Sequence, residues 1–165
     1  MQRRLFLAQA GLLTLGGCGF RLRGAPEFAF KSINISTGET SSLGNELKRT
    51  MTSLGTVQVI TEAALLPSAQ AVLDILLEQR EKTVVGVNAT GQVREFQIRL
   101  RVRFRLHTPQ GKELIPDTEI LQQRDISFNE SAVLAKETEE GLMYRDMQSD
   151  IVQQLMRRLA AVKTL

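Results

Sequence analysis

The sequence predicts an α+β fold: a two-layer sandwich with two helices on one face of a mostly antiparallel sheet of about four to five strands. Apolar residues recur at helical spacing in only two segments, near residues 43–54 and 129–162. The segments before and between these two helices alternate between apolar and polar residues, as strands do. Because two helices cannot cover both faces of a sheet this large, we expect both on the same face.

The first 18 residues have the layout of a secretory signal. Arg3 and Arg4 precede a mostly apolar stretch over residues 5–15, which is too short to span a bilayer. The stretch leads to Leu15-Gly16-Gly17-Cys18, which resembles the lipobox of bacterial lipoproteins, where the signal is cut before a cysteine that carries lipid. The alternative is a buried thiol in an N-terminal helix, but the basic, acid-free start of the chain argues against it.

This layout divides the chain into three parts. We expect a signal peptide over residues 1–17, a lipidated tether over 18–27 and a single domain over 28–165. Two membrane signals are needed for stable anchoring, so a triacylated Cys18 would hold the mature chain firmly on a membrane. Cys18 is also the only cysteine, so no intrachain disulfide can form.

The start of the domain predicts a strand, a helix and a second strand. Isoleucines alternate with polar residues in the strand expected over residues 28–36. The helix has Ser41 before it and Gly55 after it, which are typical start and stop residues. Its apolar face consists of Leu43, Leu47, Met51 and Leu54. A short β-branched strand over 56–61 follows, and Pro67 with Ser68 is expected to break the chain.

Two long hairpins and a second helix complete the predicted fold. Residues 71–77 fit a strand buried on both faces, and the chain continues to a hairpin tip at 88–91. The next strand shows the clearest alternation in the chain. Its apolar side consists of Phe96, Ile98, Leu100, Val102, Phe104 and Leu106. A turn at 109–111 returns the chain over 113–128, and the last helix extends from about 129 to 162.

The opposite side of that strand carries a row of guanidinium groups, here called the arginine ladder. It consists of Arg99, Arg101, Arg103 and Arg105. Arginine suits bidentate contact with phosphate, so the ladder could dock an anionic ligand or an acidic partner.

The alternative is a solvated face with cross-strand ion pairs. A three-residue turn would place Asp117 opposite Arg103 and Glu119 opposite Arg101. Arg99 and Arg105 would then face Leu121 and Ile115 and would lack charged partners. The sequence leaves both interpretations of the ladder open.

The composition argues against several function classes. Without residues 1–17 the chain has 19 basic and 18 acidic side chains, so no overall charge points to nucleic acid. The sequence shows no metal-binding cluster, no phosphate-binding glycine loop and no nucleophile–base pair, so we expect no metal, no cofactor and no enzymatic activity. The lone histidine, His107, is expected at the surface beside a turn, and Glu137, Glu139 and Glu140 fit the acidic start of a helix.

The segment Cys18-Gly19-Phe20-Arg21-Leu22-Arg23-Gly24 resembles the start of mature proteins of the LptE family of lipopolysaccharide-assembly lipoproteins. A weaker likeness continues at residues 90–96, beside the expected hairpin tip, and at 132–137, where the last helix would start. Gly19 after the lipidated residue is compatible with the outer membrane in this class.

The resemblance implies a lipid-anchored, periplasm-facing outer-membrane protein that plugs the LptD barrel and helps it deliver lipopolysaccharide to the cell surface, with no reaction catalysed. It also implies that basic residues on the plug contact lipopolysaccharide. Lys136 falls on one such position, at the start of the last helix. Another lies at the hairpin tip, where this chain has Ala89 or Thr90, and Arg94 is the candidate to replace it. A different class of function, a lipid-anchored periplasmic adaptor or activator of a cell-envelope enzyme, remains the alternative.

Overall fold

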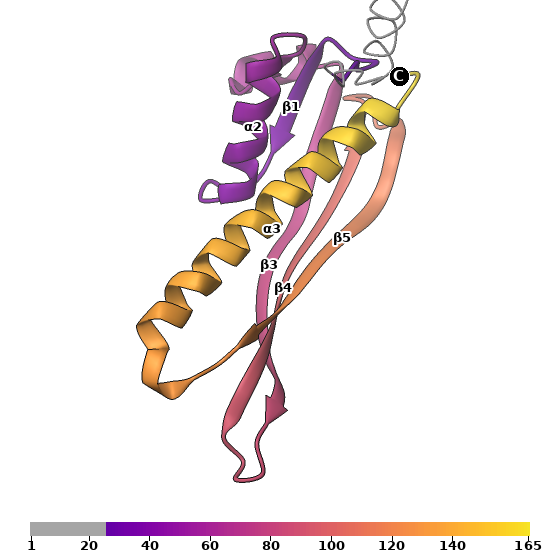
Figure 1. Cartoon of the computed structure of the whole chain (residues 1–165). Coiled ribbons are helices and arrows are strands. Elements are labelled where there is room, and N and C mark those ends of the chain that lie inside the picture. Colours follow the sequence, from indigo (N-terminus) through magenta and orange to yellow (C-terminus); the bar gives the residue numbers. More distant parts are fainter. Residues whose placement is uncertain (1–25) are drawn as a thin grey trace, which may run out of the picture.

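The computed structural model describes residues 26–165, which form one mixed five-stranded sheet with two helices on one face (Figure 1). The elements follow the predicted order of strand, helix, strand, long hairpins and helix. They are β1 (Ser32–Ser36), α2 (Ser42–Leu54), β2 (Gln58–Ile60), the 3₁₀ turn η1 (Ala63–Ser68), β3 (Ala71–Val87), β4 (Val93–His107), β5 (Glu113–Ser127), the 3₁₀ turn η2 (Glu130–Ala132) and α3 (Val133–Ala161). The expected two-layer α+β sandwich is confirmed.

The strand order in the sheet is β2-β1-β3-β4-β5. The short strand β1 pairs in parallel with both β2 and β3, whereas the much longer β3, β4 and β5 pair antiparallel. β1 ends at Ser36, opposite Asp74, so β3 continues beyond it without that neighbour. The three long strands therefore project past the first half of the domain, and the β3–β4 hairpin lies at the bottom of Figure 1.

Helix α2 begins and ends as its flanking residues predict. The Ser41 hydroxyl accepts a hydrogen bond from the Gly44 amide at 2.8 Å, which satisfies one of the free amides of the first turn. Gly55 stops the helix in the left-handed conformation, with φ of 66°, which glycine adopts without steric cost. The apolar face of α2 is buried, with Leu43, Leu47 and Met51 fully inaccessible to solvent.

The core lies between the helices and the apolar side of β4. All of the side chains from Ile98 to Leu106 on that side are fully buried, whereas Phe96, nearer the hairpin tip, is only partly buried. Helix α3 contributes a long row of buried residues. These are Tyr144, Met147, Gln148, Ile151, Val152, Leu155, Met156 and Leu159. The faces of β4 are thus assigned as the alternation predicts.

The first strand starts late, at Ser32, since Phe28 and Phe30 sit on the opposite parity from its isoleucines and pack together before it with ring centroids 5.4 Å apart. Two other local expectations are wrong. Pro67 does not simply break the chain but lies inside η1. Residues 71–77 are not buried on both faces: the register shifts between Ile75 and Leu77, and the intervening Leu76 is 43% exposed.

Candidate functional site

The arginine ladder lies on the sheet face that points away from the helices, because its members alternate along β4 with the buried core row. Three of its four guanidinium groups have carboxylate partners. Arg101 contacts Glu119 at 3.2 Å and Glu81 at 3.5 Å, and Arg103 contacts Asp117. Arg105 was expected to lack a charged partner, but it contacts Asp74 of β3 at 2.8 Å.

The register between β4 and β5 differs from the expected one by two residues. Glu119 lies opposite Arg103, and Leu121 lies opposite Arg101. The shift arises from two successive irregularities in the pairing, one between Phe104 and Leu106 and one between Leu106 and His107. The expected ion pairs nevertheless form, because diagonal neighbours across a sheet remain within reach of long side chains.

Ion pairing holds both partners of one pair in their charged forms. A hydrogen bond from Arg103 lowers the pKa of the Asp117 carboxyl, and the same bond raises the pKa of the Arg103 guanidinium. These groups are solvent-exposed, so the pair contributes little to folding stability. This part of the ladder is a charge-balanced surface, as the second interpretation of the ladder predicted.

Arg99 differs from the rest of the ladder. It lies opposite Gln123 and not Leu121, and its Nε donates to Gln97 Oε1 at 2.8 Å. No carboxylate among the described side chains lies within 4 Å of its guanidinium. Arg99 is therefore the ladder residue whose charge is least compensated.

Lys136 lies on the opposite side of the sheet, at the first turn of α3. Its ammonium group donates to Ser127 Oγ at 3.0 Å and to Glu139 Oε2 at 2.8 Å. It borders a cavity of about 250 Å³ between the start of α3 and the ends of β4 and β5. The apolar lining of the cavity consists of Phe96, Ile126, Phe128 and Val133.

A second lysine, Lys82 of β3, also lines this cavity. Its ammonium group lies 4.4 Å from the centre of the Phe96 ring and 2.6 Å from Glu140 Oε2. Phe96 and Phe128 form the floor in an edge-to-face pair, with centroids 5.2 Å apart. Glu137 and Glu140 also line the cavity, and both lysines are paired with glutamates. An apolar hollow with two ammonium groups at its rim suits a ligand that combines acyl chains with negative charge, provided that the ligand displaces these carboxylates. We call it the α3 cavity.

The structure brings only one other predicted site residue near the α3 cavity. The Arg94 carbonyl accepts a hydrogen bond from the Phe128 amide at 2.7 Å, which places the start of β4 beside the cavity floor. The Arg94 side chain is exposed, with Nη2 3.5 Å from Gln92 Oε1. The six basic residues predicted to bind ligand thus fall on two faces: Lys136 and Arg94 at the α3 cavity, and the ladder behind it.

Sequence reasoning missed Lys82. Its strand showed no clear alternation beyond residue 77, because the register shifts within β3 disturb the parity. Only the pairing of Lys82 with the buried Ile98 places it on the helix face. Cys18, the predicted lipid site, lies outside the described residues.

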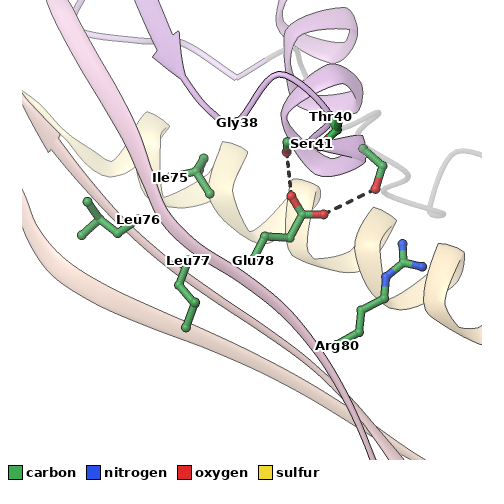
Figure 2. Close-up of a pocket in the computed structure, with 9 residues that line it drawn as sticks. Gly38, Thr40, Ser41, Ile75, Leu76, Leu77, Glu78 and Arg80 are labelled. Atoms are coloured by element: carbon green, nitrogen blue, oxygen red, sulfur yellow. Dashed lines mark hydrogen bonds between the residues drawn. The ribbon is translucent and has the colours of Figure 1, made fainter.

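A larger hollow of about 580 Å³ opens where β1 ends and β3 continues (Figure 2). Glu78 points into it and accepts hydrogen bonds from the hydroxyls of Ser41 at 2.6 Å and Ser42 at 3.4 Å. Helix α2 has no acidic residue in its first turn, so Glu78 supplies negative charge at the positive end of the helix dipole. This arrangement stabilises the helix and engages the Glu78 carboxylate. Arg80 also lines the hollow, with its guanidinium group 5.0 Å from the centre of the Tyr144 ring.

The surroundings of His107, metal-binding clusters and membrane-spanning helices bear on other kinds of site. His107 is less exposed than expected, since Nδ1 lies 2.8 Å from the Thr108 carbonyl and Nε2 lies 3.2 Å from Asp74. Within residues 26–165, no three histidine, cysteine or acidic side chains gather as a metal site would require. In the same part of the chain, no helix has the length and apolar character to cross a membrane.

Comparison with known proteins points in one direction. The family model described as "LptE: Lipopolysaccharide-assembly" matches residues 30–159. The chain is 26% identical over 168 residues to the LPS-assembly lipoprotein LptE of Pectobacterium atrosepticum, covering 98% of this chain and 88% of the relative. The protein of the same name from Yersinia pestis is also 26% identical, over 98% of this chain and 78% of the relative.

Solved structures show the same fold. The solution structure of an uncharacterized lipoprotein B from Nitrosomonas europaea superposes with a TM-score of 0.74 and 33% sequence identity, over 87% of this chain and 91% of that one. The crystal structure of the rare lipoprotein B from Shewanella oneidensis gives a TM-score of 0.65 at 24% identity, over 79% and 94% of the two chains.

Proposed function

The chain belongs to the LptE family, and from this premise we propose that it is an outer-membrane lipoprotein that plugs an LptD-like β-barrel and assists the delivery of lipopolysaccharide. The observation that carries the proposal is the family match over residues 30–159, which spans almost the whole described domain. We propose that it acts by binding and catalyses no reaction. Its relatives are named for lipopolysaccharide assembly.

The expected processing completes the proposal. Residues 1–17 would be removed, Cys18 would carry the lipid, and residues 18–27 would tether the domain over 28–165 to the periplasmic side of the outer membrane. The dimensions suit a plug. β4 has 15 residues, which at the rise of an antiparallel strand extend about 50 Å. That length is comparable to the full thickness of a bilayer, roughly 40–45 Å with its headgroups.

For lipopolysaccharide contact we propose the α3 cavity as the main site. Lys136 and Arg94 would meet the phosphate groups, and the apolar lining would shelter part of an acyl chain. Charge-assisted bonds to phosphate contribute roughly 1.5–3 kcal/mol each when sheltered from water, and less when exposed. Of the ladder, Arg99 is the member we expect to add to binding, because Arg101, Arg103 and Arg105 are paired with carboxylates. Lys136 is paired too, so it would have to exchange Glu139 for a phosphate group.

Binding of purified lipopolysaccharide by the lipidated protein in detergent tests this site. We expect Lys136→Gln to weaken binding about tenfold, the equivalent of about 1.4 kcal/mol, and to reduce the loss of affinity that added salt causes. Arg103→Gln is the matched control, because it also removes one positive charge and one ion pair. A larger loss from Arg103→Gln than from Lys136→Gln would move the site to the ladder.

The barrel partnership has a separate test. The protein should be crosslinked in intact cells, purified under denaturing conditions, and its covalent partners identified by mass spectrometry. Recovery of a large LptD-like barrel is the expected result. Recovery of a cell-wall enzyme without a barrel would favour the adaptor alternative and contradict the plug.

A further inference from the structure

A short apolar surface lies on η1, the 3₁₀ turn between β2 and β3. Its four residues, Ala64, Leu65, Leu66 and Pro67, are consecutive and all exposed. The two leucines are 44% and 38% exposed, and no charged side chain interrupts the run. We call this surface the η1 patch. Two adjacent exposed leucines at the apex of a turn form a small surface that a bilayer interface can cover.

The η1 patch lies at the end of the molecule where the described chain begins. The backbone amide of Lys31 donates to Gln70 Oε1 at 2.6 Å, and the Ser32 hydroxyl donates to the Ser68 carbonyl at 3.4 Å. Pro67 also shares a hollow of about 540 Å³ with the β4–β5 turn and the C-terminal Leu165. The C-terminus and the start of the described chain lie together at the top of Figure 1.

The length of the preceding chain limits how far this end can lie from a membrane. Seven residues separate Cys18 from Pro26, and the eight Cα-to-Cα steps between them span at most about 26–29 Å. The hairpin tip lies at the far end of β3 and β4, about 50 Å away by strand rise. A lipid on Cys18 therefore keeps the η1 end near the bilayer, whereas the tip is free to lie much farther from it.

We propose that the η1 patch rests on the phospholipid surface as a second membrane contact beside the Cys18 lipid. This rests on the lipid anchor of the proposed function and adds an orientation to it. Leu65 and Leu66 enter the interface, where amphipathic elements bury their apolar side by about 5–10 Å. Two exposed lysines lie at this end of the molecule: the Lys31 backbone amide contacts Gln70, and Lys112 lines the shared hollow, where its ammonium group donates to the Leu165 carbonyl at 2.8 Å. Their charge suits anionic headgroups, although Glu62 precedes the patch. In the proposed complex the β3–β4 hairpin then extends from the periplasmic leaflet into the barrel.

A fluorescent probe on a single introduced cysteine tests the contact. Lipidation occupies the sulfur of Cys18, the only cysteine, so a thiol placed by Leu65→Cys is unique in the mature chain. The lipidated protein is labelled with an environment-sensitive NBD dye and reconstituted in phosphatidylethanolamine–phosphatidylglycerol vesicles, with and without lipid that carries a doxyl quencher near the headgroup. Gln110→Cys, in the polar β4–β5 turn at the same end, and Thr90→Cys, at the hairpin tip, are the controls.

We expect the Leu65 probe to shift to the blue and to lose most of its emission to the quencher. The Gln110 probe should lose less, and the Thr90 probe almost none. Quenching at Leu65 no greater than at Gln110 would overturn the contact, and a blue shift without quenching would show that protein and not lipid covers the patch. Mass spectrometry of the same sample reports acylation of Cys18, so failure of the anchor is distinguished from failure of the patch.

Discussion

The two halves of the long strands are held in different ways. Near the η1 end, Ala71 and Leu73 of β3 are fully buried under the helices. Near the hairpin tip, Val85 and Val87 of the same strand are 49% and 60% exposed. On the helix face of β3, apolar residues give way to Glu78, Arg80 and Lys82 in the distal half.

The distal half depends on polar contacts with α3 instead. The Tyr144 hydroxyl donates to the Glu81 carbonyl at 2.8 Å, Arg80 lies 5.0 Å from the centre of the Tyr144 ring, and Lys82 pairs with Glu140. Each such contact contributes about 1 kcal/mol or less, whereas a buried aliphatic side chain contributes roughly 1.5–3 kcal/mol. The half of the strands nearest η1 therefore supplies most of the folding stability. The distal half can expose polar and apolar groups to a ligand.

The largest expected effect is in the core of β4. Leu100→Ala should lower the free energy of unfolding by about 2–5 kcal/mol, because it leaves a cavity under the helices. Leu134→Ala is the matched control, since the same atoms are removed from a side chain that is 81% exposed. Urea unfolding measures both variants. Similar small losses in the two would mean that the helix-facing side of β4 is not the core.

A smaller effect is expected where α3 contacts the distal half. Tyr144→Phe removes the hydroxyl that binds the Glu81 carbonyl and should cost about 0.5–1.5 kcal/mol. Amide hydrogen exchange should quicken within residues 78–87 and remain unchanged in α2. Thr138→Val, which removes an exposed hydroxyl on the same helix, should leave exchange in β3 unaffected. Faster exchange throughout the domain would contradict a separately held distal half.

The Tyr144 contact also has a pH dependence. Burial raises the pKa of its phenol above the ordinary value of 10.0, so the protonated donor persists in the folded state. Its contribution to stability is fully present below pH 10 and is lost as the pH rises through the raised pKa. Tyr144→Phe should therefore flatten the alkaline end of the stability profile.

The smallest effect is expected on the ladder face. The pKa of Asp117 is lowered by its hydrogen bond from Arg103, so the pair stabilises the fold above pH 3.8, the ordinary pKa of the carboxyl. Asp117→Asn should be slightly less stable than the parent chain at neutral pH, and the gap should close as the pH falls through the lowered pKa. If the stability difference between Asp117→Asn and the parent chain stayed constant at acidic pH, the difference would come from packing and not from charge.

The fold could be predicted from the sequence where one pattern dominates. The helix caps at Ser41 and Gly55 and the alternation along residues 96–106 are local signals, and both are confirmed. The strand over 71–87 could not be assigned correctly, because its faces are set by three register shifts and by contacts with α3 that no local pattern encodes.

The candidate site was predictable only in part, because it also depends on contacts between segments that are distant in the sequence. Lys136 and Arg94 were selected through the family resemblance, and the structure brings both to the α3 cavity. The alternation along β4 also predicts that the ladder faces away from the helices, and the structure confirms it. The sequence could not supply Asp74 as the partner of Arg105, because that pair depends on which strand lies beside β4.

The central claim is that the distal half enters a barrel while the opposite end stays at the membrane. A photoreactive amino acid introduced at Val87, at the exposed end of β3, tests it most directly in living cells. We expect a covalent product with an LptD-like barrel from Val87, and a much weaker product from Gln110 at the η1 end. Strong crosslinking to the barrel from Gln110 with none from Val87 would contradict the proposed orientation, and no barrel product from either position would contradict the plug itself.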